Sequence, residues 1–225
     1  MIAALALAAA LALPSSALPA PSPLQPAARF VARIETIDLA QAATMIPSTW
    51  RAGCPVHLRD LRLLTVRFWG FDGRMHDGEI IVHRVVASDI VGVFRTLFDA
   101  RFPMRRIVLE DRYENIPNGS TLANNTTGFD CRPVTGGSRW SRHAYGLAVD
   151  INPLQNPYVY EDGHVSDPRA ERYLDRAQRL PGMIHDGDVV VRAFERIGWR
   201  WGGDFVSTPD YQHFDLDPAT LASRR

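Results

Sequence analysis

One stretch near the middle of the chain, residues 140–153, joins a run of small and apolar residues to two side chains that can bind a metal. It reads WSRHAYGLAVDINP, so His143 and Asp150 stand seven positions apart. Val149 and Ile151 flank the carboxylate with the alternation of a strand, which predicts that both face the core and that Asp150 faces a cleft. A carboxylate on so apolar a strand needs a partner, and a cation is one way to supply it.

A second stretch near the end of the chain reads DYQHFD and offers another imidazole, His213, three positions after Asp210. Two histidines and one aspartate make a three-ligand set for a catalytic Zn²⁺ ion, with the fourth position left to water. We therefore expect His143, Asp150 and His213 to bind zinc, which leaves Asp210 as a candidate general base. The other histidines are expected to be surface or hydrogen-bonded residues: His57, His76, His83, His164 and His185.

The beginning of the chain differs in composition from the rest. The apolar run 1–13 is followed by Ser15 and Ala17, small residues of the kind found at cleavage sites, and it is shorter than the roughly 20 residues of a membrane-spanning helix. We predict a signal peptide over 1–17, a proline-rich linker over 18–29, and no membrane span after cleavage. Since no basic segment precedes the run, the alternatives are a start further upstream, an atypical signal, or a stray apolar tail.

Residues 30–225 are expected to form one domain with a substantial core. Within it, the strand-like segments 61–69 and 79–83 are separated by turn residues and predict a hairpin. Apolar residues at helical spacing then predict a helix from Asp89 to about Arg101, with Ser88 as its N-cap.

Further strands are predicted at 106–109 and 211–216, and a further helix at 189–197. These elements predict an α+β fold, a small antiparallel sheet with helices packed on one face. The polar segment 110–140 lies directly before His143, and long irregular segments in compact domains are commonly functional. We expect this segment to form a wall of the substrate cleft.

The charged residues bear on two questions: whether the protein binds nucleic acid, and whether it can use a catalytic lysine. The chain carries 25 basic and 25 acidic side chains, so nothing indicates a nucleic-acid partner. Because all of the basic residues are arginines, chemistry that requires a catalytic or Schiff-base lysine is excluded.

Cys54 and Cys131 are the only cysteines. In an exported protein an even number permits a disulfide, and one that closes so long a loop would contribute roughly 4 to 5 kcal/mol to stability. Two buried free thiols and two zinc ligands are the alternatives. Zinc is the weaker alternative, because the sequence has no Cys-x-x-Cys pair and the His/Asp set is complete without them. We predict the bridge, on condition that the chain is exported.

The pattern Ser-x-His-x-x-Gly-x-Ala-x-Asp, followed later by Asp-Tyr-x-His-Phe, resembles the VanY-type D-alanyl-D-alanine carboxypeptidases. These belong to a zinc metallopeptidase superfamily that also holds lysostaphin and the Hedgehog signalling domain. The nearest branch contains phage endolysins that cut L-alanyl-D-glutamate bonds. The resemblance covers residues 61–216 and extends beyond the ligands to Asn124-Asn125-Thr126, Cys131-Arg132, Asn152-Pro153 and residues 198–203.

The resemblance implies a Hedgehog/D-Ala-D-Ala-peptidase-like fold and a role for Asp210. This residue occupies the position of the family's catalytic acid, which takes a proton from water and delivers it to the leaving amine. The alternatives are that Asp210 merely caps a turn, and that Asp215, on the same strand face as His213, is the functional carboxylate. As the competing candidate, Asp215 would accept a hydrogen bond from the N–H of an imidazole that binds the metal.

Two substrate contacts are also implied by the resemblance. Arg132 would bind a peptide carboxylate or stabilise an oxyanion, and Ser141 would hydrogen-bond the peptide. Arg112 is an alternative cation. Trp199 and Trp201 are expected in the core.

We therefore predict a secreted zinc peptidase that acts on the stem peptides of bacterial cell walls. The resemblance implies D-Ala-D-Ala carboxypeptidase or L-Ala-D-Glu endopeptidase activity, and the choice depends on pocket contacts. A non-catalytic, zinc-bearing cell-wall binding module of the same fold is the competing class, and another zinc amide hydrolase is a third alternative. The intact Asp210 argues against the binding module.

Overall fold

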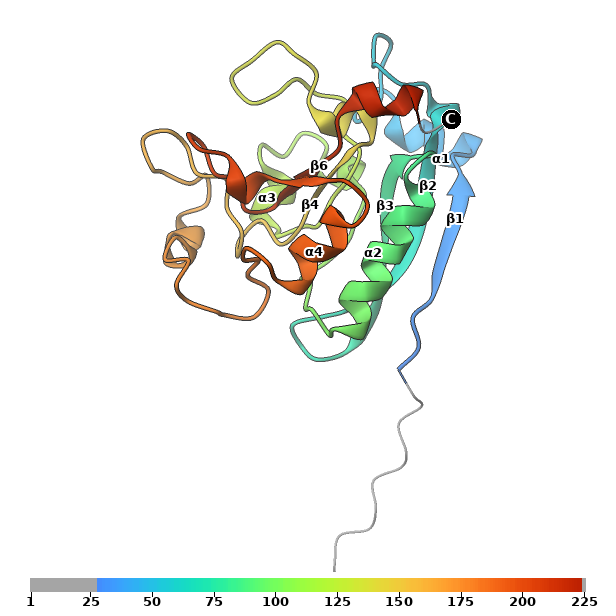
Figure 1. Ribbon diagram of the computed structural model, residues 1–225. Helices are drawn as coiled ribbons and strands as arrows, with labels where there is room; N and C mark the ends of the chain where they lie inside the picture. Colours follow the sequence, from blue (N-terminus) through green and yellow to red (C-terminus); the bar gives the residue numbers. More distant parts are fainter. Residues whose placement is uncertain (1–27, 224–225) are drawn as a thin grey trace, which may run out of the picture.

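Two separate antiparallel sheets organise the part of the chain that the computed structural model describes, residues 28–223 (Figure 1). The predicted signal peptide and most of the predicted linker lie outside the described residues. The strands of the first sheet, in the order β1-β2-β3, are β1 (Ala32–Thr36), β2 (Leu61–Trp69) and β3 (Met75–His83). Those of the second sheet, in the order β4-β6-β5, are β4 (Ala148–Asp150), β5 (Arg200–Trp201) and β6 (His213–Asp215).

The helical elements are short, and they lie between and around the sheets. The α-helices are α1 (Leu39–Met45), α2 (Ala87–Asp99), α3 (Gly119–Leu122) and α4 (Val189–Glu195). Short segments of 3-10 helix are η1 (Leu58–Asp60), η2 (Glu110–Tyr113), η3 (Arg142–Tyr145), η4 (Pro168–Tyr173), η5 (Gly202–Asp204) and η6 (Pro218–Ala222). The predicted α+β class is confirmed, with the antiparallel strands divided between two sheets. None of these helices is long and apolar enough to cross a bilayer, as far as residues 28–223 are concerned.

β2 and β3 form the hairpin that the sequence predicts. The register runs from Leu61 opposite His83 to Trp69 opposite Met75, so β3 begins at Met75 and is longer than expected. Alternate residues of both strands point to one face, which is apolar and buried. The buried residues of that face are Leu64, Val66, Phe68, Ile80 and Val82.

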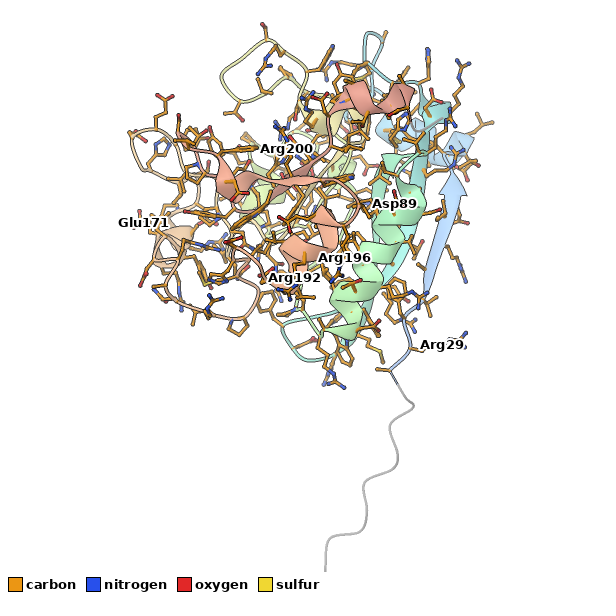
Figure 2. All side chains as sticks on the ribbon, in the orientation of Figure 1. Arg29, Asp89, Glu171, Arg192, Arg196 and Arg200 are labelled. Carbon is orange, nitrogen blue, oxygen red and sulfur yellow. A yellow bond between two sulfur atoms is a disulfide. The ribbon has the colours of Figure 1, made fainter. Side chains whose placement is uncertain are left out.

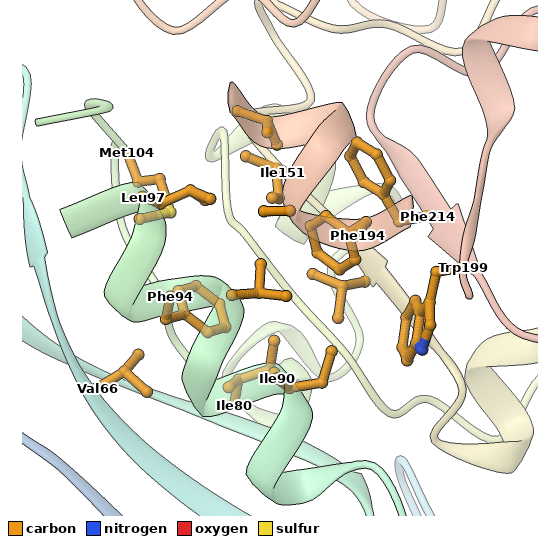
Figure 3. Packing of buried hydrophobic residues seen from close by; sticks show 14 of the residues in the cluster. Val66, Ile80, Ile90, Phe94, Leu97, Met104, Ile151, Phe194, Trp199 and Phe214 are labelled. Carbon is orange, nitrogen blue, oxygen red and sulfur yellow. The ribbon is translucent and has the colours of Figure 1, made fainter. Parts of the chain in front are cut away.

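α2 lies along the hairpin and carries a buried apolar stripe at helical spacing, as predicted (Figure 1). The predicted N-cap is wrong: the helix begins at Ala87 after Val86, no side chain caps it, and Ser88 lies within the first turn. The other side of α2 packs against α4, so that both sheets share one core. Figure 3 shows this core, in which Phe94 and Leu97 of α2 join Phe194, Phe214 and Ile151 from the region of the second sheet.

The predicted strand at 106–109 is wrong, because a side chain takes the place of a neighbouring strand. The Asn125 amide accepts a hydrogen bond from the Val108 N–H and donates one to the Val108 carbonyl, each at 2.9 Å. Only an isolated bridge between Ile107 and Thr126 remains there. The predicted helix at 189–197 is confirmed as α4, and the strand predicted at 211–216 is confirmed as the shorter β6.

A long irregular segment, residues 151–188, is fixed beside the second sheet by side-chain hydrogen bonds. The Arg176 guanidinium donates to the carbonyls of Gln155, Tyr173 and Ile184, and its carbon Cζ lies 4.3 Å from the centre of the Tyr211 ring. Such satisfaction of backbone carbonyls allows a segment without regular structure to be buried. The segment thereby becomes a fixed wall next to residues 209–211.

Candidate metal centre

The first predicted ligand, His143, lies in a tight turn, the 3-10 segment η3. The Ser141 hydroxyl accepts a hydrogen bond from the His143 backbone N–H at 3.3 Å and caps η3, which ends at Gly146 with φ of +66°. A Cβ atom at Gly146 would lie 2.6 Å from the backbone nitrogen of His83, so the position requires glycine for conformation and for space. The spacing of the motif between His143 and Asp150 therefore reflects one turn followed by one strand.

The two halves of the site meet on neighbouring strands. Asp150 of β4 pairs with His213 of β6, and both side chains point to the face opposite the core. Val149 and Ile151 are fully buried on the core side, which confirms the predicted alternation. One ligand atom from each of His143, Asp150 and His213 lies within 4.8 Å of the other two. The structure thus brings all three predicted ligands together.

The two imidazoles present different nitrogens to the centre. Nδ1 of His143 lies 2.5 Å from the Gly128 carbonyl and donates to it, which leaves Nε2 for a metal. That Nε2 lies 3.2 Å from Asp150 Oδ2 and 3.3 Å from Nδ1 of His213. Nδ1 of His213 in turn lies 2.8 Å from Asp150 Oδ1, whereas its Nε2 faces Asp215. Three potential ligand atoms, two imidazole nitrogens and one carboxylate oxygen, therefore lie close together.

The electrostatics of the cluster suit a cation. Burial alone would raise the pKa of Asp150, but the two imidazoles outweigh it and lower that pKa. Burial would lower the pKa of His213, but hydrogen bonds with Asp150 and Asp215 raise it to about 10. His213 is therefore protonated in the absence of a metal. A bound metal would displace this proton, since metal binding to such ligands releases protons. Two nitrogens and one carboxylate oxygen form a donor set that fits zinc.

Asp210 lies beside the three ligands without being one of them. Its Oδ1 is buried and has no hydrogen-bond partner within residues 28–223, and its backbone is held by Gly202, whose carbonyl accepts from the Asp210 N–H at 2.9 Å. Burial raises its pKa to about 6, and the charge of Asp150 acts in the same direction, although His213 opposes it. A partly buried carboxylate with a pKa near neutrality, one of whose oxygens no described residue hydrogen-bonds, is suited to proton transfer.

Asp215 has a different environment, although it also lies on the site face of β6. Both of its oxygens are bound by the guanidinium of Arg200, at 2.9 Å each. Burial would raise its pKa, but hydrogen bonds with His213 and Arg200 outweigh burial and lower it. Asp215 is consequently a poorer proton acceptor than Asp210.

A cavity of about 700 Å³ opens in front of the ligands, and both predicted substrate contacts line it. Arg132 forms an ion pair with Asp130, with Nε 3.1 Å from Oδ2. Ser141 is buried, and its hydroxyl accepts the hydrogen bond from the His143 N–H. Arg112, the alternative cation, is not among the lining residues. Trp199 and Trp201 are buried in the core as expected.

The sequence assigned no role to several lining residues: Glu110, Asp130, Tyr158, Tyr160, Phe205, Gln212, and Arg200 of the stretch 198–203. Burial raises the pKa of both Glu110 and Asp130. The only sequence signal for these two is their place in the polar segment 110–140, which was expected to form a wall of the cleft. That segment does line the cavity.

The predicted disulfide is present. Cys54 and Cys131 are bonded, with a Cα–Cα distance of 5.9 Å across 77 positions of sequence. Cys131 directly precedes Arg132, and its N–H donates to the Thr49 carbonyl at 2.9 Å. The bridge therefore ties one wall of the cavity to the segment before β2, and neither cysteine is a zinc ligand.

Comparison with known proteins agrees with this arrangement. The family model described as D-alanyl-D-alanine carboxypeptidase matches residues 135–216, which is 82 of the 225 residues. No curated protein and no solved structure matches the chain. The matched segment contains His143, Asp150, Asp210 and His213, while Arg132 precedes it. The resemblance predicted from the sequence is thereby confirmed for residues 135–216: this segment, which contains the three candidate metal ligands, is similar to the D-alanyl-D-alanine carboxypeptidase family.

Proposed function

We propose that this protein is a zinc-dependent peptidase that hydrolyses a peptide bond in the stem peptides of bacterial peptidoglycan. One observation carries the proposal. His143, Asp150 and His213 converge beside Asp210, a partly buried carboxylate whose Oδ1 has no hydrogen-bond partner among residues 28–223, and all four residues line a cavity of about 700 Å³. A metal site beside a proton acceptor is the combination that metal-assisted amide hydrolysis uses at neutral pH.

The residues of the site divide the chemistry between them. Zinc held by two imidazoles and a carboxylate supplies a Lewis acid and lowers the pKa of bound water to about 7. Asp210 accepts a proton from the attacking water at its free Oδ1 and returns it to the nitrogen of the leaving amine. Because its pKa is about 6, Asp210 is ionised at neutral pH and is still able to donate after the attack.

Although carboxylates also line the cavity and pair with some of its arginines, its guanidinium groups are candidates to bind a carboxylate of the substrate. Four guanidinium groups line the cavity, those of Arg132, Arg139, Arg142 and Arg200. Guanidinium groups are always charged and bind carboxylates through two parallel hydrogen bonds. A stem peptide offers such groups at its end and along its chain. By the resemblance, Arg132 would bind a peptide carboxylate or the oxyanion, and Ser141 would hydrogen-bond the peptide; both line the cavity.

We place the protein outside the cytoplasm. The disulfide between Cys54 and Cys131 supports this location, because such bonds persist in oxidising compartments. The apolar run 1–13 supports it from the sequence.

Digestion of purified peptidoglycan identifies which bond the protein cuts, D-Ala-D-Ala or L-Ala-D-Glu. The zinc-loaded protein is incubated with sacculi, and the new ends are identified by mass spectrometry. Release of free D-alanine identifies a carboxypeptidase, and new amino-terminal D-glutamate identifies an endopeptidase. New ends at the bond between glycan and peptide would instead identify an amidase.

The competing proposal, a zinc-bearing binding module, predicts co-sedimentation with sacculi and no new ends. The Asp210→Asn variant is the matched control for the digestion, because it removes the proton acceptor while the three ligands remain. Products formed equally by both proteins would point to a contaminating hydrolase and would contradict the proposal.

A further inference from the structure

The second sheet pairs an arginine with a buried carboxylate at the edge of the metal centre. Arg200 of β5 stands directly opposite Asp215 of β6 in the strand register. The guanidinium binds the carboxylate through two hydrogen bonds, from Nε to Oδ1 and from one terminal nitrogen to Oδ2, each 2.9 Å long. This is the planar two-point geometry that only arginine supplies.

The same carboxylate reaches the metal centre. Asp215 shares the site face of β6 with His213, and its Oδ2 lies 3.6 Å from Nε2 of that imidazole. A carboxylate on that side of the ring favours a proton on Nε2, which leaves the lone pair of Nδ1 directed at His143 and Asp150. The ring therefore lies between two carboxylates, and the outer one sets its orientation.

We infer that Arg200 is a positioning residue of the metal centre: it fixes Asp215 so that His213 presents Nδ1 to the ion. The inference rests on the proposed zinc site and adds a residue that contacts Asp215 and not the metal ligand His213 itself. Hydrogen-bond partners of metal ligands commonly change metal affinity or activity by about 10 to 100-fold when they are removed.

Burial explains why the arginine matters. The Asp215 side chain is 5 % exposed, so its charge needs a partner, whereas that of Arg200 is 59 % exposed. Among residues 28–223, the other arginine in contact with Asp215 is Arg142, whose Nε lies 3.9 Å from Oδ2 and which also contacts Asp217. One contact at that distance cannot fix the plane of a carboxylate. Without Arg200, Asp215 would keep a counter-charge but lose its orientation.

The test measures zinc affinity, which does not depend on turnover. Zinc-free wild-type, Arg200→Gln and Arg200→Lys proteins are titrated with zinc against a chelating indicator. Arg200→Gln should bind zinc about 10 to 100-fold more weakly, and Arg200→Lys should recover only part of the loss, because lysine lacks the fork. Arg196→Gln is the matched control, an exposed arginine at the end of α4 whose removal should leave zinc affinity unchanged (Figure 2).

Asp215→Asn and the double variant separate positioning from other roles. If Arg200 acts through Asp215, Arg200→Gln adds little to the loss of zinc affinity that Asp215→Asn causes alone. Circular dichroism of the zinc-free proteins should remain like that of the wild type. Full zinc affinity in Arg200→Gln, with a raised KM, would overturn the inference and make Arg200 a substrate contact. A wild-type protein that binds no zinc would instead refute the proposed function, and with it the inference.

Discussion

Asp150 and His213 are 63 positions apart in sequence, yet they pair across β4 and β6 with Oδ1 of the aspartate 2.8 Å from Nδ1 of the histidine. Two of the three residues of the candidate metal centre are therefore brought together by the same strand pairing that forms the second sheet. The third residue, His143, comes from the turn before β4. A site built in this way couples metal binding to folding.

Removal of either imidazole should abolish metal binding. In His143→Ala and His213→Ala, only one imidazole and Asp150 remain, so we expect no stoichiometric zinc and no peptidase activity. Metal analysis of the purified variants by mass spectrometry measures the zinc content. His57→Ala, at an exposed histidine outside the site, is the control and should keep wild-type zinc and activity. Full zinc occupancy in either site variant would refute the ligand assignment.

Asp210→Asn should separate chemistry from metal binding. Asparagine keeps the size of the side chain but cannot accept the proton, and general-base assistance contributes about 10² to 10⁴-fold. We expect kcat to fall by at least that order while zinc content stays near one ion per chain. Kinetics of stem-peptide hydrolysis, together with metal analysis of the same samples, test both parts.

Asp215→Asn should act through the metal ligand instead. We expect a loss of about 10 to 100-fold in zinc affinity or activity, because the His213 ring loses its outer partner. If Asp215→Asn abolished turnover with zinc fully bound, and Asp210→Asn remained active, the two roles would have to be exchanged.

The sequence predicted the parts of the fold that have a clear period. The hairpin of β2 and β3, the stripe of α2 and the two residues beside Asp150 all follow from alternation or helical spacing. The three metal ligands came from residue types and from the resemblance. All of these signals are local in the sequence.

The other features of the fold and the site depend on long-range contacts that hydrophobic periodicity does not reveal. Asn125 replaces a strand partner for Val108 through its side chain, so an apolar segment that reads as a strand does not become one. Arg200 lies in a strand of two residues, too short for any alternation, and its partner Asp215 follows only from the register of β5 and β6. Long-range pairing of this kind becomes visible only in three dimensions.

Reduction of the disulfide should lower stability and loosen the cavity wall. The bridge spans 77 positions, for which the chain-entropy estimate is roughly 4 to 5 kcal/mol. We expect a clear fall in Tm when Cys54–Cys131 is reduced, measured by thermal melting with and without a reductant. The Cys54→Ser, Cys131→Ser double variant should melt at the temperature of the reduced protein and should not respond to the reductant. Two alkylatable thiols in freshly purified native protein would contradict the bridge.

His83 should make folding stability depend on pH. Burial at the end of β3 lowers its pKa, and its Nδ1 accepts a hydrogen bond from the Val85 N–H at 3.3 Å, which only the neutral ring can do. The unfolded histidine titrates near pH 6.5, so below that pH the unfolded state binds more protons than the folded state, and stability falls as the pH is lowered. The free energy of unfolding of zinc-free protein, measured in urea between pH 8 and pH 5, should decline less steeply in His83→Gln than in the wild type. His57→Gln, which removes an exposed histidine, controls for the general effect of losing one imidazole. Equal slopes for wild type and His83→Gln would show that His83 does not carry this dependence.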